Sequence, residues 1–314
     1  MFQRKPRKRL KKRFCVLNYL LDVLQFGGLM KKIVVLAKQV PDTANITGDA
    51  MKPDGTVNRS ALPAIYNPED LNALEMGLTI RDELGGEVFV ITMGPAKAVE
   101  ILKHSLYMGA DRVFLITDRK FAAADTLATS YVLAEAIKKI GNVDLVLAGR
   151  QAIDGDTAQV GPQVAEKIDY NQVTYVSALK EISDDHLIVE RDGEVQTEVI
   201  KVGFPVLLTV TAEANTPRFP NCRRMLHYFR ADLAENFSDD KKELAKENNW
   251  IIPTLSMEDL ELVEDRCGLK GSPTKVHKIK SITLKGGDLK MYGTETTDIK
   301  QLVRDIMKDY VEVN

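Results

Sequence analysis

The chain has 314 residues, of which 44% are hydrophobic and 28% charged, and its formal net charge is −2. This length is typical of about two domains of roughly 150 residues each, and the composition is that of a globular protein with a sizeable core. The small net charge gives no sign of a nucleic-acid partner, and three cysteines far apart in the sequence exclude a disulfide scaffold.

Cysteine and histidine, the usual ligands of zinc and iron sites, are few and scattered in this sequence. The cysteines form no CxxC pair and the four histidines form no HExxH motif, so we expect no metal centre. The lack of a disulfide framework fits a reducing compartment, so we expect a cytoplasmic location.

Residues 1–29 form an unusual N-terminal extension that we expect to lie outside the fold. Residues 1–14 are strongly basic, and residues 15–29 are mostly apolar but too short and too polar to span a bilayer. A signal peptide would have a small-residue cleavage site after the apolar run, and a transit peptide would contain serine, which is absent here. A third interpretation is a translation start placed too far upstream of Met30.

From residue 32 onward, apolar strands alternate with amphipathic helices. We expect strands at 33–37, 88–92, 113–116 and 144–149, and helices at 68–84, 97–107, 125–139 and 157–168, with a polar excursion over 41–64. This alternation predicts an α/β fold with a Rossmann-like open parallel sheet and helices on both faces.

After residue 170 the pattern changes to a two-residue period. Segments 173–179, 186–190, 195–202 and 206–211 are predicted to be appended antiparallel strands, which either extend the parallel sheet or form a small separate layer. The chain after residue 212 is charged and less regular, and it ends in an amphipathic helix around Ile299–Tyr310. We therefore divide the chain into 1–29, a nucleotide-binding domain at 30–222, and an extended C-terminal arm at 223–314 that embraces a partner.

Residues 144–163, DLVLAGRQAIDGDTAQVGPQ, are the best candidate for a nucleotide-binding loop. No GxGxxG or P-loop motif is present, so main-chain N–H groups and hydroxyls at strand and helix ends must hold a nucleotide. The loop can converge with the exit of the first strand, the Met93-Gly94-Pro95 turn and a helix start at Asp125, because parallel strands bring their carboxyl ends together. Each piece also has a simpler interpretation. Gly94-Pro95 can be an ordinary turn, Asp125 a plain N-cap, and Lys38 at the strand exit a solvated side chain. The Asp154-Gly155-Asp156 stretch lacks the further oxygen ligands of a calcium loop.

Several segments together resemble one known family. MKKIVVLAKQVPDT at 30–43, Asn67-Pro68-Glu69-Asp70, Met93-Gly94-Pro95, Met108-Gly109-Ala110-Asp111 and the loop after Asp144 occur in the order and spacing of electron-transfer flavoprotein beta subunits. The resemblance covers roughly residues 30–230 and favours Met30 as the first residue. It implies a heterodimer with an FAD-bearing alpha subunit, in which no residue of this chain need act as a catalytic acid, base or nucleophile.

The resemblance also implies an adenine nucleotide in the loop region. Respiratory-type members hold AMP there, whereas members of the anaerobic, electron-bifurcating type hold a second FAD that reacts with NADH. The segments 126–130 and 155–161 look more like the bifurcating type, so we expect FAD, with AMP as the alternative. The positions carried over as cofactor-binding residues are Leu36, Asn67, Met93, Gly94, Asp125, Thr126, Thr129, Gln151, Asp154, Gly155, Asp156, Thr157, Ala158, Gln159, Val160 and Gly161.

A partner-recognition loop follows the appended strands in this family. Pro217, Arg218 and Phe219 match its start, and Cys222, Arg223 and Arg224 follow. In well-studied members an apolar tip residue enters an acyl-CoA dehydrogenase, but here Cys222 occupies the tip. The resemblance therefore implies a dehydrogenase as the partner, either an acyl-CoA dehydrogenase or another one. The two arginines either form a solvated face or steer an acidic partner.

The resemblance thus predicts an electron carrier between NADH or acyl-CoA dehydrogenases and other redox partners. Two alternatives belong to other classes. One is a non-redox module that senses an adenine nucleotide, and the other is a nucleotide hydrolase, for which the sequence offers no paired acid and base.

Overall fold

The computed structural model describes residues 31–42, 62–274 and 290–311. The expectations for residues 1–29 lie outside these ranges, as does most of the polar excursion at 41–64. Within the described residues, no helix is both long enough and apolar enough to cross a membrane.

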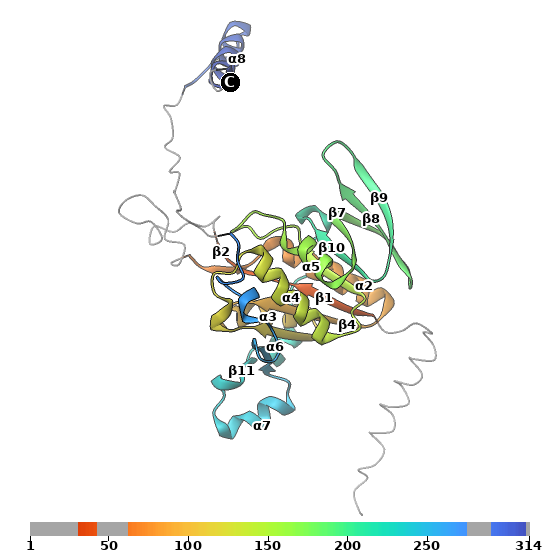
Figure 1. The fold of residues 1–314 in the computed structure, drawn as a ribbon. Coiled ribbons are helices and arrows are strands. Elements are labelled where there is room, and N and C mark those ends of the chain that lie inside the picture. The colour runs from red at the N-terminus through yellow and green to blue at the C-terminus, as the bar shows by residue number, and fades with distance from the viewer. Residues whose placement is uncertain (1–30, 43–61, 275–289, 312–314) are drawn as a thin grey trace, which may run out of the picture.

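A nine-stranded sheet forms the centre of the fold (Figure 1). Its strand order is β13-β5-β4-β1-β6-β10-β7-β8-β9. The strands are β1 (Lys32–Leu36), β4 (Glu87–Met93), β5 (Arg112–Ile116), β6 (Leu145–Gly149), β7 (Asn171–Ile182), β8 (His186–Asp192), β9 (Thr197–Gly203), β10 (Val206–Val210) and β13 (Thr254–Leu255). From β1 the chain adds β4 and β5 on one side and β6 on the other, all in parallel. The order therefore reverses between β1 and β6, which is the topological switch point where open α/β sheets bind ligands.

The predicted parallel sheet is confirmed, and the strands after residue 170 extend it instead of forming a separate layer. β7, β8 and β9 pair in antiparallel fashion, and Figure 1 shows β8 and β9 projecting as a hairpin. The antiparallel prediction for residues 206–211 was wrong, because β10 inserts between β6 and β7 and is parallel to both. All five of its side chains are buried, as expected for a parallel strand covered on both faces.

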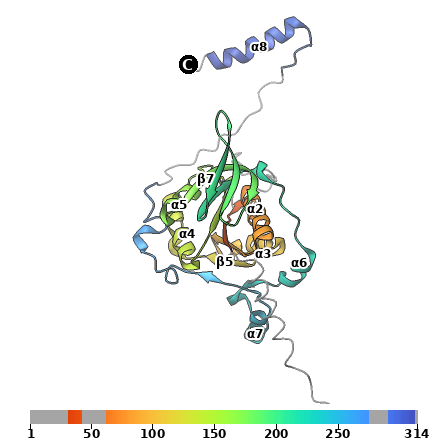
Figure 2. The same cartoon turned by 90° about the vertical axis from the view of Figure 1, so that its right-hand side faces the viewer.

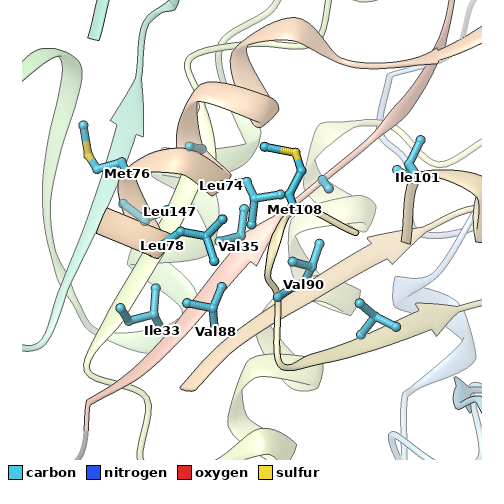
Figure 3. Close-up of a cluster of buried hydrophobic side chains, with 14 of the residues drawn as sticks. Ile33, Val35, Leu74, Met76, Leu78, Val88, Val90, Ile101, Met108 and Leu147 are labelled. Carbon is cyan, nitrogen blue, oxygen red and sulfur yellow. The ribbon is translucent and has the colours of Figure 1, made fainter. Parts of the chain in front are cut away.

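Helices cover both faces of the sheet (Figure 2). α2 (Pro68–Leu84) and α3 (Val99–Met108) pack on one face, and α4 (Thr126–Ile140) and α5 (Val160–Ile168) pack on the other. Figure 3 shows part of the first core, where Leu74 and Leu78 of α2 lie against Ile33 and Val35 of β1. The sequence explains the helix ends, since Asp125 caps α4 and glycines with positive φ follow α2 and α4. α5 begins at Val160, three residues later than predicted.

The remaining described elements lie mostly in the C-terminal third. They are α6 (Cys222–Tyr228), β11 (Asp232–Leu233), α7 (Asp239–Glu247), β12 (Ile251–Ile252) and α8 (Thr296–Val311), with β2 (Gln39–Pro41) paired to β3 (Ala64–Tyr66) near the N-terminus. Short 3-10 turns occur at η3 (Ala96–Ala98), η4 (Arg119–Phe121), η5 (Ala212–Ala214), η6 (Ala234–Asn236) and η7 (Glu264–Arg266).

The C-terminal arm predicted at 223–314 is not wholly separate from the sheet, because β13 pairs with β5. The domain division itself stays a prediction. The predicted amphipathic helix is present as α8, and Ile299, Val303 and Ile306 on it are about half exposed.

Candidate functional site

A cavity of about 860 Å³ opens at the carboxyl ends of β1, β4, β5 and β6. Its floor is formed by residues at the strand ends, such as Leu36, Met93, Ile116 and Ala148. The start of α4, the start of α5 and the loop before α5 also line it. The cavity therefore lies at the switch point between β1 and β6, where the fold is expected to bind a ligand.

The structure brings most of the predicted cofactor-binding residues to this one cavity. The lining includes Leu36, Met93, Gly94, Asp125, Thr126, Thr129, Gln151, Gly155, Asp156, Thr157, Ala158, Gln159, Val160 and Gly161. Asn67 and Asp154 are not part of the lining. Both residues hold the loop from outside the cavity, and a direct contact between either of them and a cofactor stays a prediction.

Asn67 is fully buried and holds the loop after β6 through two main-chain contacts. Its side-chain amide donates to the carbonyl oxygen of Gln151 at 2.9 Å, and its side-chain oxygen accepts from the N–H of Ile153 at 3.1 Å. Asp154 pairs with Lys38, whose ammonium group lies 2.6 Å from its carboxylate. Both contacts fix the path of the loop that forms one wall of the cavity.

Two carboxylates at the start of α2 hold the same wall. Glu69 accepts from the N–H of Gln151 at 2.9 Å and pairs with Arg150 at 2.8 Å. Asp70 accepts from the N–H groups of Lys38 and Gly149. Burial raises the pKa of Asp70 to about 7, although the Asn67 side chain and the two N–H donors favour its charged form.

The start of α4 presents a capped but polar end to the cavity. One oxygen of Asp125 accepts from the N–H groups of Leu127 and Ala128, and the other accepts from the N–H of Thr274. Burial opposes the charged form of Asp125, but these donors outweigh it and hold its pKa below the ordinary value. The Thr126 hydroxyl donates to the side-chain oxygen of Gln159 at 3.0 Å, which ties α4 to the start of α5.

The loop before α5 has the geometry of an anion cradle. Asp156 and Ala158 have φ values of 49° and 51°, a left-handed conformation that is uncommon outside glycine. Ala158 is followed by Gln159 in the right-handed region, and such a pair directs successive N–H groups into a concavity. Within the described residues, no acceptor binds the N–H groups of residues 157–159, and no side chain caps α5. These main-chain donors are therefore available to a phosphate.

The exit of β5 is a part of the lining that the sequence analysis missed. Residues 117–119 and 121–124 line the cavity between β5 and α4, and Thr274 joins them. Among the described lysines and arginines of the lining, Lys38 and Arg150 form ion pairs, whereas Arg119 forms none. The strand at 113–116 was predicted, so the rule of strand carboxyl ends could have identified this loop.

The predicted partner-binding residues divide into two groups. Arg218 pairs with Glu75 at 2.8 Å and with Asp82 at 2.9 Å, both on α2. Arg224 donates to the carbonyl oxygens of Leu106 and Ala110 near the end of α3. The guanidinium groups of these two arginines therefore already bind other groups of the same chain.

The other predicted partner-binding residues are accessible to a partner. Phe219 is 94% exposed, and Cys222 and Arg223 are exposed at the start of α6, while Pro217 is partly buried. Within the described residues, no group of His, Cys, Asp and Glu is arranged to hold a metal ion.

Comparison with known proteins places these features in context. Residues 54–243 match the family model described as the electron transfer flavoprotein domain. The chain is 48% identical to the electron transfer flavoprotein subunit beta of Thermoanaerobacterium thermosaccharolyticum, over 78% of this chain and 85% of the relative. It is 44% identical to subunit CarD of the caffeyl-CoA reductase-Etf complex of Acetobacterium woodii, over 85% and 94%. It is also 44% identical to the electron transfer flavoprotein subunit beta of Clostridium acetobutylicum, over 81% and 89%.

Proposed function

The chain belongs to the electron transfer flavoprotein family, and we propose that it is the beta subunit of a heterodimer that binds FAD in the cavity at the β1–β6 switch point. The observation that carries this proposal is the joining of four strand ends and two helix starts around one cavity. AMP in the same place is the alternative occupant.

The size of the cavity supports FAD over AMP. Small-molecule sites occupy roughly 300–1,000 Å³, and the cavity of about 860 Å³ lies near the upper end of that range. A dinucleotide uses such a volume more fully than a mononucleotide does. One relative is named as a subunit of a caffeyl-CoA reductase-Etf complex, which fits the electron-bifurcating type that the resemblance indicates and supports the same choice.

The donor groups of the cavity fit a diphosphate. Residues 157–161 supply main-chain N–H groups at the start of α5. Thr126 and Thr129, which carry hydroxyl groups, line the cavity at the start of α4. Both features bind phosphate without a lysine. Asp125 and Asp156 would repel a phosphate, and both already accept hydrogen bonds from protein groups, so they position the wall and are suited to ribose hydroxyls.

A flavin bound here would supply the redox chemistry, and the chain's own residues would bind it, orient it and exclude water. Leu36, Ile116, Leu133 and Ala148 form an apolar floor under the polar rim. This arrangement keeps one part of a ligand dry while the rim binds its charged part. It assigns no acid, base or nucleophile to the chain.

The partners follow from the same assignment. We propose an FAD-bearing alpha subunit as the constant partner, NADH as an electron donor, and an acyl-CoA or other dehydrogenase as the exchanging partner, in the cytoplasm. The name of the Acetobacterium relative places that protein with a CoA-ester reductase, which supports this class of partner. The exposed Phe219 and Arg223 offer an apolar and a basic contact for it.

Purification of the heterodimer with its alpha subunit, followed by cofactor extraction, tests the proposal. We expect two FAD molecules per heterodimer and reduction of flavin by NADH. One FAD and one AMP, without reaction with NADH, would restrict the proposal to the AMP-binding type. A colourless complex would contradict an electron-transfer role and favour a nucleotide sensor.

A further inference from the structure

Asp70 connects the two strands that flank the switch point. Its Oδ2 atom accepts from the N–H of Lys38 at 2.8 Å, two residues after the end of β1, and its Oδ1 atom accepts from the N–H of Gly149 at 3.0 Å, at the end of β6. The β1–β6 ladder ends at the pair Leu36 and Ala148. The carboxylate therefore links the strands just where their own pairing stops.

We propose that Asp70 is a positioning residue that fixes the separation of the β1 and β6 exits and thereby sets the shape of the nucleotide cavity. The inference rests on the proposed function, because it concerns the site that would hold the nucleotide. Asp70, Lys38 and Gly149 all line that cavity. A change at Asp70 is thus transmitted through main-chain atoms to the exits of two neighbouring strands, both of which line the cavity.

The contact requires a carboxylate on one side and a glycine on the other. A carboxylate offers an acceptor oxygen to each N–H group, whereas an asparagine offers one acceptor and one donor. A Cβ atom at Gly149 would lie 2.4 Å from Oδ1 of Asp70 and 2.8 Å from the main-chain carbon of Glu69. Gly149 therefore permits the close approach of α2 to β6 that lets the carboxylate reach both strands.

The burial of this carboxyl is costly to the fold. Asp70 is only 6% exposed, it lies beside Glu69, and its pKa is raised to about 7 by burial. An ionisable group kept in such a place points to a role at a site, because an apolar residue would be less costly for stability alone.

The chain contains a matched control at the opposite, amino-terminal ends of the same two strands. Asp144, which precedes β6, accepts from the N–H of Lys32 at 2.8 Å, at the start of β1. It thus joins the amino ends of β1 and β6, away from the cavity lining. Loss of this contact tests the general effect of removing a side-chain link between β1 and β6.

The test uses the heterodimer with its alpha subunit, from which the nucleotides have been removed, titrated with FAD. We expect Asp70→Asn to raise the dissociation constant of the beta-site FAD by about tenfold or more. We also expect it to change the visible absorption of that flavin, while the alpha-subunit flavin stays as in the unaltered protein. Asp144→Asn should leave both flavins unchanged.

Two outcomes would overturn the inference: equal FAD affinity in Asp70→Asn and the unaltered protein, or an equal loss in Asp144→Asn. If the unaltered heterodimer bound no adenine nucleotide in this cavity, the proposed function would fail instead. Should Asp70→Asn not assemble, Asp70→Glu carries the test, because it keeps the charge and both acceptors but lengthens the link. The inference then expects weaker FAD binding in Asp70→Glu, and unchanged binding would refute it.

Discussion

The ammonium group of Lys38 lies 2.6 Å from Oδ1 and 2.8 Å from Oδ2 of Asp154, so one ion pair joins the exit of β1 to the loop after β6. The side chains of Lys38 and Asp154 are 47% and 25% exposed. Solvent therefore screens the pair, and it holds the loop more than it stabilises the fold.

Replacement of Lys38 by alanine should loosen the cavity wall without unfolding the chain. We expect the free energy of unfolding to change by less than about 1 kcal/mol and the dissociation of the nucleotide to become about fivefold faster. Stopped-flow fluorescence of the flavin measures the rate. Lys138→Met, which breaks a similarly exposed pair with Glu135 on α4, is the control. An unchanged rate in Lys38→Ala would show that the pair does not restrain the loop.

Arg119 should contribute to nucleotide affinity through its charge, because it lines the cavity without an ion pair among the described residues. We expect Arg119→Gln to weaken FAD binding by about fivefold at low salt and by less at high salt. The neighbouring Lys120 pairs with Glu264, so Lys120→Gln serves as the control. Similar losses in both variants would mean that the effect is a general one of surface charge.

Arg218 should act as a structural anchor and not as a partner contact. Glu75 is buried, so removal of the arginine would leave an uncompensated carboxylate and cost about 3 kcal/mol in the free energy of unfolding. Urea denaturation of Arg218→Met measures this loss, and the double change with Glu75→Gln should recover part of it. A normal urea midpoint together with weaker binding to the dehydrogenase would reverse this assignment.

Asp70 should make stability depend on pH. Its pKa is about 7 in the folded chain and close to the ordinary 3.8 when unfolded, so between these values the folded state binds more protons. Stability from this group is thus fully present below about pH 3.8 and is lost as the pH rises through about 7. Urea midpoints across this range should fall less steeply in Asp70→Asn than in the unaltered chain. Parallel curves for the two proteins would show that Asp70 does not titrate in this range.

Much of the fold could be predicted because its signals are local. The apolar runs of β1, β4, β5 and β6 and the Asp125 cap of α4 are visible in the sequence, and the helix predicted at 125–139 lies at Thr126–Ile140. The direction of β10 was missed, because direction depends on where the chain returns to the sheet. Its continuous apolar run was the available signal for a parallel strand.

The site was predictable to the extent that it follows strand ends. Met93, Gly94 and residues 155–161 meet in the cavity because parallel strands align their carboxyl ends. The roles of Asn67 and Arg218 were not accessible, because their partners lie 84 and 143 positions away in the sequence. Only the folded chain shows that these side chains hold main-chain segments in place.

The most direct test of the central claim is a high-resolution structure of the heterodimer purified with its own nucleotides. The account predicts an adenine nucleotide in the cavity between β1 and β6, with its phosphates at the N–H groups of residues 157–161. A map in which side chains fill this cavity, or in which the second nucleotide occupies another part of the complex, would contradict it.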